Sequence, residues 1–314
     1  MKKSSLASLI VLALSVSTAH AATDLHNCEE VLAIPSGTQE TYTLANDIEC
    51  NGFTQANAID FSGVLEGKGF SISNLTVSYT NTNRNTGLFS RVQGGKVSDL
   101  NLINFNVRNA YRIQNGTGAL AGYSDPQSVF ENIKVSDSHI TFDGTSGKGV
   151  GSIIGWMAGG QAYSLISEAN EIVANEALYL GSVVGYVSGE AFINDTTSSK
   201  STVTSTYGNS SYVGGVFGRV AGGSKAMNIS MGGNTINALS LTGGAVGGFS
   251  GDVTASHSIL SNGVFTEENN INAALASDTL FVGYLVGAVK NGGATSDLPT
   301  LTDSSLNPYG LYED

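Results

Sequence analysis

The feature that most constrains the fold is a five-residue unit that has glycine at both ends and apolar residues at its third and fourth positions. Five copies keep this pattern, and weaker copies begin at Thr86 and Gly283. The seven copies start at Thr86, Gly118, Gly151, Gly181, Gly214, Gly243 and Gly283, so successive copies lie 32, 33, 30, 33, 29 and 40 residues apart. A period this steady predicts a stacked array of repeats.

A second series of small polar residues keeps the same register. It lies nine or ten residues after each unit and comprises Asp99, Asn132, Ser164, Asn194, Asn228 and Ser256, with Asn74 preceding them. Asn and Asp tolerate left-handed backbone angles, so we expect this series at the corners between strands.

Each repeat contains two apolar segments that are too short for helices and are bounded by Gly, Asn and Ser, as strands are. Stacking repeat on repeat pairs each strand in parallel with its copies, about 4.8 Å apart. Hydrophobic residues make up 41% of the chain, which argues against a disordered glycine-rich sequence. We therefore predict an all-β parallel β-helix, or β-solenoid, of about seven to eight coils.

The start of the chain resembles a secretory signal peptide. Lysines follow Met1, residues 6–16 are apolar, and Ala19-His20-Ala21 forms an A-x-A cleavage signal. We expect a soluble mature protein that starts near Ala22 and is secreted or on the bacterial cell surface, with the periplasm as another location. It should not span a membrane, because the apolar run is too short.

Charge and cysteines bear on partners and on stability. The formal net charge is −12, which disfavours binding to nucleic acid or anionic membranes. An exported protein meets oxidising conditions, so we expect a disulfide between Cys28 and Cys50. It would cap the amino-terminal end of the array, where exposed strand edges could otherwise recruit other chains.

Residues 42–49 and 61–77 alternate like half-buried strands, and Thr86-Gly87-Leu88-Phe89 and the glycine units follow them. This arrangement resembles the GLUG-repeat family over roughly residues 40–293. The resemblance implies a β-helical scaffold of the kind found in bacterial secreted and surface proteins. These include adhesin-like proteins and the non-catalytic region of immunoglobulin A-cleaving metallopeptidases.

Four segments are expected. Residues 1–21 are the signal peptide, 22–80 the amino-terminal cap and first coil, 81–293 the GLUG-like repeats, and 294–314 a carboxy-terminal cap or tail.

Catalytic motifs are not evident in the sequence. No His lies in an H-E-x-x-H motif, and no calcium-binding or phosphate-binding loop appears, so we expect no metal, no cofactor and no catalytic residues. One enzymatic alternative remains, because many β-helices cleave acidic polysaccharides with carboxylates and a basic residue on an outer face. The nearest candidates are Arg84, Arg91, Lys96, Arg108 and Arg112, with Asp99 and Asp125.

A row of aromatic and cationic residues directly follows the glycine units. The row reads Arg91, Tyr123, Trp156, Tyr186 and Arg219. Stacked coils would place these residues in a line suited to sugar rings or to a protein partner. The alternative is a buried aromatic stack. An outward row would also expose Ile154, Val184 and Phe217, which loops, a second strand layer or another chain must then cover, so an oligomer is possible.

The leading expectation is a secreted, non-enzymatic binding or structural protein, adhesin-like or part of a matrix. Its partner would be a glycan or a cell-surface or matrix component. The alternative is a polysaccharide-active enzyme, a lyase or hydrolase. A third possibility, ice binding, would need outward Thr rows over several coils, and Thr202, Thr204 and Thr206 supply only one.

Overall fold

The computed structural model describes residues 21–79, 85–110, 116–145, 147–206, 212–238, 241–243, 246–250, 259–265, 270–273, 282–283, 286–290, 294–295 and 309–312. Side chains are described as far as Ala238. The expected signal peptide, apart from Ala21, and most of the expected carboxy-terminal segment lie outside these residues. So do Arg84, Arg112 and Ser256.

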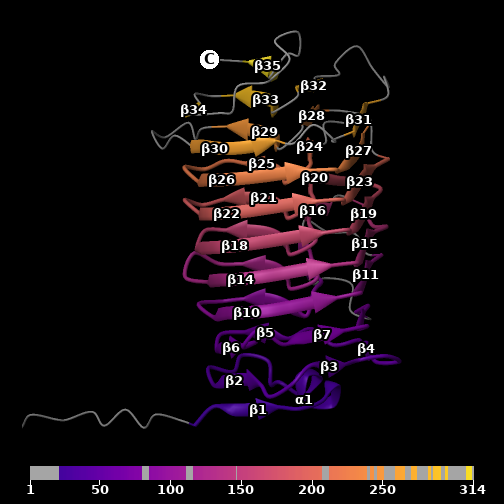
Figure 1. Cartoon of the computed structure of the whole chain (residues 1–314), viewed down its shortest axis with the longest axis vertical. Coiled ribbons are helices and arrows are strands. Elements are labelled where there is room, and N and C mark those ends of the chain that lie inside the picture. Colours follow the sequence, from indigo (N-terminus) through magenta and orange to yellow (C-terminus); the bar gives the residue numbers. More distant parts are fainter. Residues whose placement is uncertain are drawn as a thin grey trace, which may run out of the picture.

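The described chain is a parallel β-solenoid whose strands lie across the long axis and stack along it (Figure 1). Each turn takes one strand from each of four sheets, so the twenty strands from β9 to β28 make five turns. Further strands continue the stack on both sides. The predicted fold class is confirmed, although the number of complete turns is slightly lower than seven to eight.

We name the four sheets A to D. Sheet A contains β1 (Thr23–Leu25), β2 (Thr41–Leu44), β3 (Ile48–Glu49), β6 (Val64–Glu66), β7 (Ser71–Ser73), β10 (Lys96–Ile103), β14 (Val129–Ser136), β18 (Gln161–Glu168), β22 (Phe192–Ser199), β26 (Lys225–Gly232), β30 (Ile259–Phe265) and β34 (Ala294–Thr295). Sheet B contains β4 (Thr54–Gln55), β8 (Thr76–Val77), β11 (Asn106–Asn109), β15 (His139–Phe142), β19 (Glu171–Ala174), β23 (Thr202–Ser205), β27 (Thr235–Ala238) and β31 (Asn270–Ala273).

Sheet C contains β5 (Asp60–Phe61), β9 (Phe89–Val92), β13 (Ala121–Ser124), β17 (Ile154–Ala158), β21 (Val184–Ser188), β25 (Phe217–Val220), β29 (Val246–Ser250), β33 (Val286–Lys290) and β35 (Tyr309–Tyr312). Sheet D contains β12 (Gly116–Thr117), β16 (Gly147–Val150), β20 (Ala177–Gly181), β24 (Tyr212–Gly214), β28 (Leu241–Gly243) and β32 (Val282–Gly283).

The core is built from apolar residues that stack in register from coil to coil. One such row in sheet A is Val97, Phe130, Ala162, Ile193 and Ala226, and each of these residues is completely buried. Burial of one Leu, Ile or Phe side chain contributes about 1.5 to 3 kcal/mol before the entropy of ordering is counted. Alternate residues of the same strands face outward, which explains the alternating sequence pattern.

From Asp99 to Asn228, the polar series expected at corners lies instead inside the long strands of sheet A, whereas Asn74 lies, as expected, in the bend between β7 and β8. Left-handed backbone angles, with φ between 52° and 61°, occur at Asn74, Asp99, Asn132, Ser164, Asp195 and Asn228. In the fourth coil, Asp195 therefore holds the position that we expected for Asn194. The amide of Asn132 donates to the Asp99 carboxylate over 2.8 Å, so the series forms hydrogen bonds along the stack.

The glycine units exist because sheet D packs directly on sheet C. A β-carbon added at Gly185 would lie 2.2 Å from the backbone nitrogen of Val150, and one at Gly218 would lie 2.4 Å from that of Leu180. Only glycine allows two backbones to approach this closely. The unit is thus the contact between two strand layers.

The same packing shows what covers the apolar row described in the sequence analysis. Ile154, Val184 and Phe217 are completely buried within the chain. Sheet D supplies the second strand layer, because β16 contacts β17 and β21, and β20 contacts β25. The expectation that this row is available for an oligomer interface is therefore corrected.

A short cap stands at the amino-terminal end of the solenoid. The disulfide between Cys28, in helix α1 (Cys28–Leu32), and Cys50, just after β3, is present with Sγ atoms 1.99 Å apart. Asn27 caps α1 by accepting a hydrogen bond from the backbone of Glu30 over 3.0 Å. Within the described residues, no helix has the length and apolar character needed to cross a bilayer.

Candidate cation–aromatic site

The five residues of the expected row lie side by side on sheet C. Tyr123 pairs in register with Arg91 and with Trp156, and Tyr186 pairs with Trp156 and with Arg219. All five side chains are half-buried. The row is therefore neither a core stack nor a fully exposed strip.

The aromatic rings in this row contact one another. The Tyr123 and Trp156 rings meet edge to face with centroids 5.1 Å apart, and the Trp156 and Tyr186 centroids are 5.8 Å apart. The Trp156 indole N–H donates to the hydroxyl of Ser188, one coil further along, over 2.9 Å. These contacts fix the position of the indole.

Sheet D adds three residues that the sequence analysis did not select. They are Lys148 on β16, Tyr179 on β20 and Tyr212 on β24. The Lys148 ammonium lies 3.8 Å from the centroid of Trp156 and 5.6 Å from that of Tyr186. The Tyr179 ring stacks on Tyr186 at 4.4 Å and lies 5.7 Å from Tyr212.

Arg219 joins the two sheets. Its guanidinium carbon lies between 5.3 and 5.9 Å from the ring centroids of Tyr179, Tyr186 and Tyr212. It also donates a hydrogen bond to the Tyr179 hydroxyl over 2.9 Å. At the other end of the row, the Arg91 guanidinium lies 5.8 Å from the Tyr123 centroid, and Asp60 is its register neighbour on β5.

We call the eight residues Arg91, Tyr123, Lys148, Trp156, Tyr179, Tyr186, Tyr212 and Arg219 the cation–aromatic site. Cations over aromatic faces attract the rings electrostatically, and the attraction grows where water is excluded. The site therefore presents guanidinium and ammonium donors beside flat apolar faces, which suits a ligand that combines anionic groups with rings or apolar faces.

Partial burial changes two titrating groups of the site. Desolvation lowers the pKa of Lys148 from its ordinary 10.5, and the neighbouring positive charge of Arg219 lowers it further. Desolvation raises the pKa of Tyr123 from its ordinary 10.0, Asp125 raises it further, and Arg91 opposes the change. Among the described residues, no carboxylate forms an ion pair with Lys148.

The sequence does not single out Lys148, Tyr179 and Tyr212, because they do not share one position in the repeat. Tyr179 and Tyr212 are register neighbours on sheet D, but glycine holds the same row at Gly116 and Gly149 and leucine at Leu241, and Lys148 lies outside this row. The usable signal was the short segment before each glycine unit, which holds a strand in every coil from β12 onward.

Of the basic residues that cluster in the sequence, the three that the structure describes lie on different sheets. Arg91 lies on sheet C, Lys96 on sheet A and Arg108 on sheet B. Lys96 forms an ion pair of 2.6 Å with Glu131, and Arg108 forms one of 2.9 Å with Asp143. Consecutive strands of one coil belong to different sheets, so these three described residues do not form one catalytic group.

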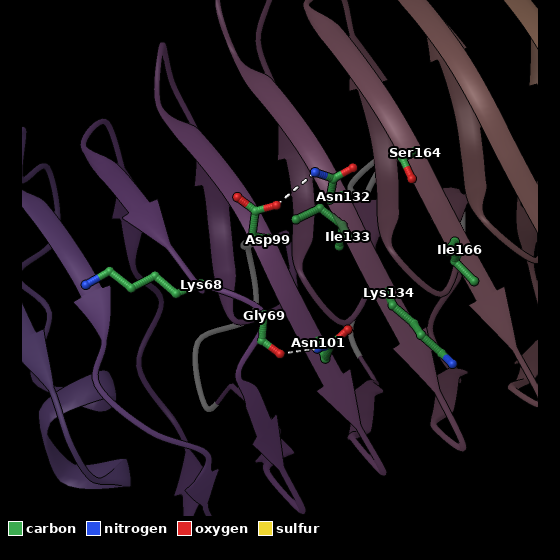
Figure 2. A pocket seen from close by; sticks show the side chains of 9 residues that line it. All are labelled: Lys68, Gly69, Asp99, Asn101, Asn132, Ile133, Lys134, Ser164 and Ile166. Carbon is green, nitrogen blue, oxygen red and sulfur yellow. Dashed lines mark hydrogen bonds between the residues drawn. The ribbon is translucent and has the colours of Figure 1, made fainter.

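A separate pocket of about 560 Å³ lies on sheet A (Figure 2). Its lining residues are Lys68, Gly69, Asp99, Asn101, Asn132, Ile133, Lys134, Ser164 and Ile166. Asn132 and Asn101 are held by hydrogen bonds to Asp99 and to the backbone of Gly69, respectively. The described residues contain no group of three or more His, Cys, Asp or Glu placed to hold a metal ion.

Comparison with protein families finds no family model that matches the chain, and comparison with curated proteins finds no match. Two solved structures are similar to it. One is described as a candidate immunoglobulin A1 protease from Bacteroides ovatus, with 14% identity, a TM-score of 0.43, and coverage of 93% of this chain and 84% of that chain. The other, named IgA1 protease, has 16% identity, a TM-score of 0.48, and coverage of 90% of this chain and 22% of that chain.

These names correct one expectation from the sequence. Both similar structures are named as enzymes, so the expectation of a non-enzymatic, adhesin-like or matrix protein is withdrawn. At these identities the likeness concerns the fold alone, and it assigns neither proteolysis nor any residue role to this chain.

Proposed function

We propose that this chain is a polysaccharide-active enzyme and that the cation–aromatic site is the surface on which it holds an acidic polysaccharide. The observation that carries the proposal is the convergence of Lys148 and Arg219 on one set of aromatic rings. The chain has a formal net charge of −12, and yet it places these cations together on one face.

The chemistry of the site fits a sugar that bears a carboxylate. The apolar faces of sugar rings stack on half-exposed aromatic side chains such as Trp156 and Tyr186. Arginine has a planar fork of donors that matches a carboxylate, and lysine supplies a point charge. Five stacked coils give the row four steps of about 4.8 Å each, so an extended polymer can follow the solenoid axis.

The setting of the protein is part of the proposal. A basic start, the apolar run and the A-x-A signal support export, and the disulfide fits an oxidising compartment. We also propose that the repeats belong to the GLUG-repeat type, on the strength of the glycine units. An exported enzyme of this type would meet acidic polysaccharides outside the cytoplasm.

The test is a panel of acidic and neutral polysaccharides, scored for retention of the full chain and for release of products. We expect uronate polymers to be retained and cleaved, with retention falling as salt is added, because the attraction is electrostatic. Variants Arg219→Gln and Trp156→Ala should lose retention, whereas Lys134→Gln on sheet A should keep it. Equal retention of neutral polymers, or full retention by both site variants, would overturn the proposal.

A further inference from the structure

Lys148 and Arg219 flank the same ring. The Lys148 ammonium nitrogen lies 5.6 Å from the Tyr186 centroid, and the Arg219 guanidinium carbon lies 5.9 Å from it. Lys148 comes from sheet D and Arg219 from sheet C, so the packing of the two sheets brings them together. A sugar resting on the rings would have a cationic group of each kind beside it.

The surroundings of Lys148 also distinguish it from two lysines on sheet A, Lys96 and Lys134, which form ion pairs with Glu131 and Glu168. Lys148 instead sits 3.8 Å above the face of Trp156, where it is partly removed from water.

From this geometry we infer that Lys148 is the general base of a β-elimination on a 4-linked uronate, and that Arg219 holds the uronate carboxylate. This inference rests on the proposed function and specifies its reaction. It separates a lyase from a hydrolase, because elimination consumes no water.

The step balances without another reactant. The neutral amine of Lys148 takes the proton from C5, which is acidic because it lies next to the carboxylate. The C5–H electrons form the C4–C5 double bond while the bond between C4 and O4 breaks. The new ammonium on Lys148 returns the proton to O4, which leaves as the new chain end. Arg219 balances the charge that develops on the carboxylate.

Two features of its environment favour the neutral form of Lys148 that the step requires, and the Trp156 face, which attracts the ammonium, opposes them. A general base must be neutral, and desolvation and the charge of Arg219 both lower the pKa of Lys148. Trp156 and Tyr186 lie beside its ammonium, and Arg219 is the charged group that acts on it. Glu176, whose backbone oxygen accepts a hydrogen bond from Gly147, makes no ion pair with Lys148 in the described chain.

The experiment uses the full chain, a uronate polymer and the variants Lys148→Arg and Lys134→Arg. Binding is read by retention, and reaction by the absorbance of the unsaturated uronate and by new reducing ends. We expect the wild-type rate to rise with pH as Lys148 loses its proton, below pH 10.5. Lys148→Arg should keep retention and its thermal midpoint but lose about 100-fold or more in rate, because arginine stays protonated. Lys134→Arg should keep both retention and rate.

The outcomes separate the two proposals. No retention of any acidic polymer would overturn the proposed function. Retention with reducing ends but no unsaturated product would mean hydrolysis, and would overturn the inference alone. Full elimination activity in Lys148→Arg would also overturn the inference alone, whereas retention without any cleavage would overturn both the inference and the proposed enzymatic function.

Discussion

The backbones of Gly155 and Thr117 are in direct contact: a β-carbon added at Gly155 would lie 2.1 Å from the Thr117 nitrogen. This contact joins β17 of sheet C to β12 of sheet D. Because Lys148 reaches Trp156 across the same interface, the spacing of the two layers also sets the geometry of the cation–aromatic site.

Gly155→Ala should therefore destabilise the solenoid strongly. Overpacking against side chains costs about 1 to 3 kcal/mol, and backbone atoms cannot move aside as side chains do, so we expect the upper end of this range or more. Urea unfolding followed by circular dichroism measures the change.

Gly52→Ala is the matched control. Gly52 has φ of +82° and no atom within 4 Å of the added carbon. Only the left-handed backbone then opposes alanine, at a cost of about 1 to 2 kcal/mol. Equal losses in the two variants would mean that the layers are not in contact.

Removing the disulfide should weaken the amino-terminal end of the array. Cys28 and Cys50 are 22 residues apart in sequence, a span for which the loop-entropy model gives about 3 kcal/mol. The double variant with both cysteines changed to serine should lose about this free energy of unfolding. Peptide mass mapping of the exported wild type without reductant gives the control. If both cysteines were free thiols, the double variant would have no disulfide to lose, and no loss of unfolding free energy would be expected from it.

Trp156→Ala should affect binding more than folding. A central aromatic residue in an interface contributes about 2 kcal/mol or more of binding energy. Because the indole is half-buried, the loss of folding free energy should be smaller than the 3 to 5 kcal/mol expected for a fully buried tryptophan. Affinity for the uronate polymer and the thermal midpoint are measured on the same samples.

Tyr163→Ala is the control for Trp156→Ala, since Tyr163 is a half-buried aromatic on sheet A that packs 5.7 Å from Phe192. It should leave affinity unchanged. Trp156 is also the chain's only tryptophan, so its fluorescence reports directly on this site. No change in fluorescence on adding a polymer that is retained would place the binding surface elsewhere.

The ion pair between Glu168 and Lys134 should make the free energy of unfolding depend on pH in the acidic range. A hydrogen bond from Lys134 at 2.7 Å, then the charge of Lys134, and lastly that of Lys200 lower the pKa of Glu168 below its ordinary 4.5. A lowered carboxylate pKa stabilises the fold above the ordinary value, and the contribution is lost as pH falls through the lowered one. The pair is partly exposed, so about 0.5 kcal/mol is expected.

Urea unfolding of wild type and Lys134→Met between about pH 6 and pH 3 tests this contribution. The difference between the two proteins should shrink as the pH falls. A difference that stays constant across the range would assign the effect to lost packing of the lysine stem rather than to charge.

The sequence predicted the stacked coils and the row from Arg91 to Arg219, because both depend on one period. Its prediction for the polar series was right for Asn74, which lies in a bend, but wrong from Asp99 to Asn228, where the series lies within strands rather than at corners. Period alone fixes how far apart Asp99 and Asn132 lie along the chain, but not where the chain bends between them. The bend is set by how four strands close into one turn.

The three residues that sheet D adds to the cation–aromatic site could not be predicted from the spacing of the repeats. Lys148 precedes its glycine unit by three residues, whereas Tyr179 and Tyr212 precede theirs by two. These three residues come together because sheet D packs on sheet C. In the sequence, only the repeated glycines mark this tertiary contact. Conversely, Lys96 and Arg108 are close in sequence and lie on different sheets, because each coil turns between them.

Because the coils stack in register, the number of coils that the cation–aromatic site spans can change without a change in the contacts within each coil. Residues 151–180 form one coil that meets its neighbours through the same four sheets as the coils before and after it. Duplicating such a segment in the gene would add one step of about 4.8 Å and leave every other step unchanged. Evolution could therefore match the number of coils to a longer or shorter polymer without redesigning a single contact.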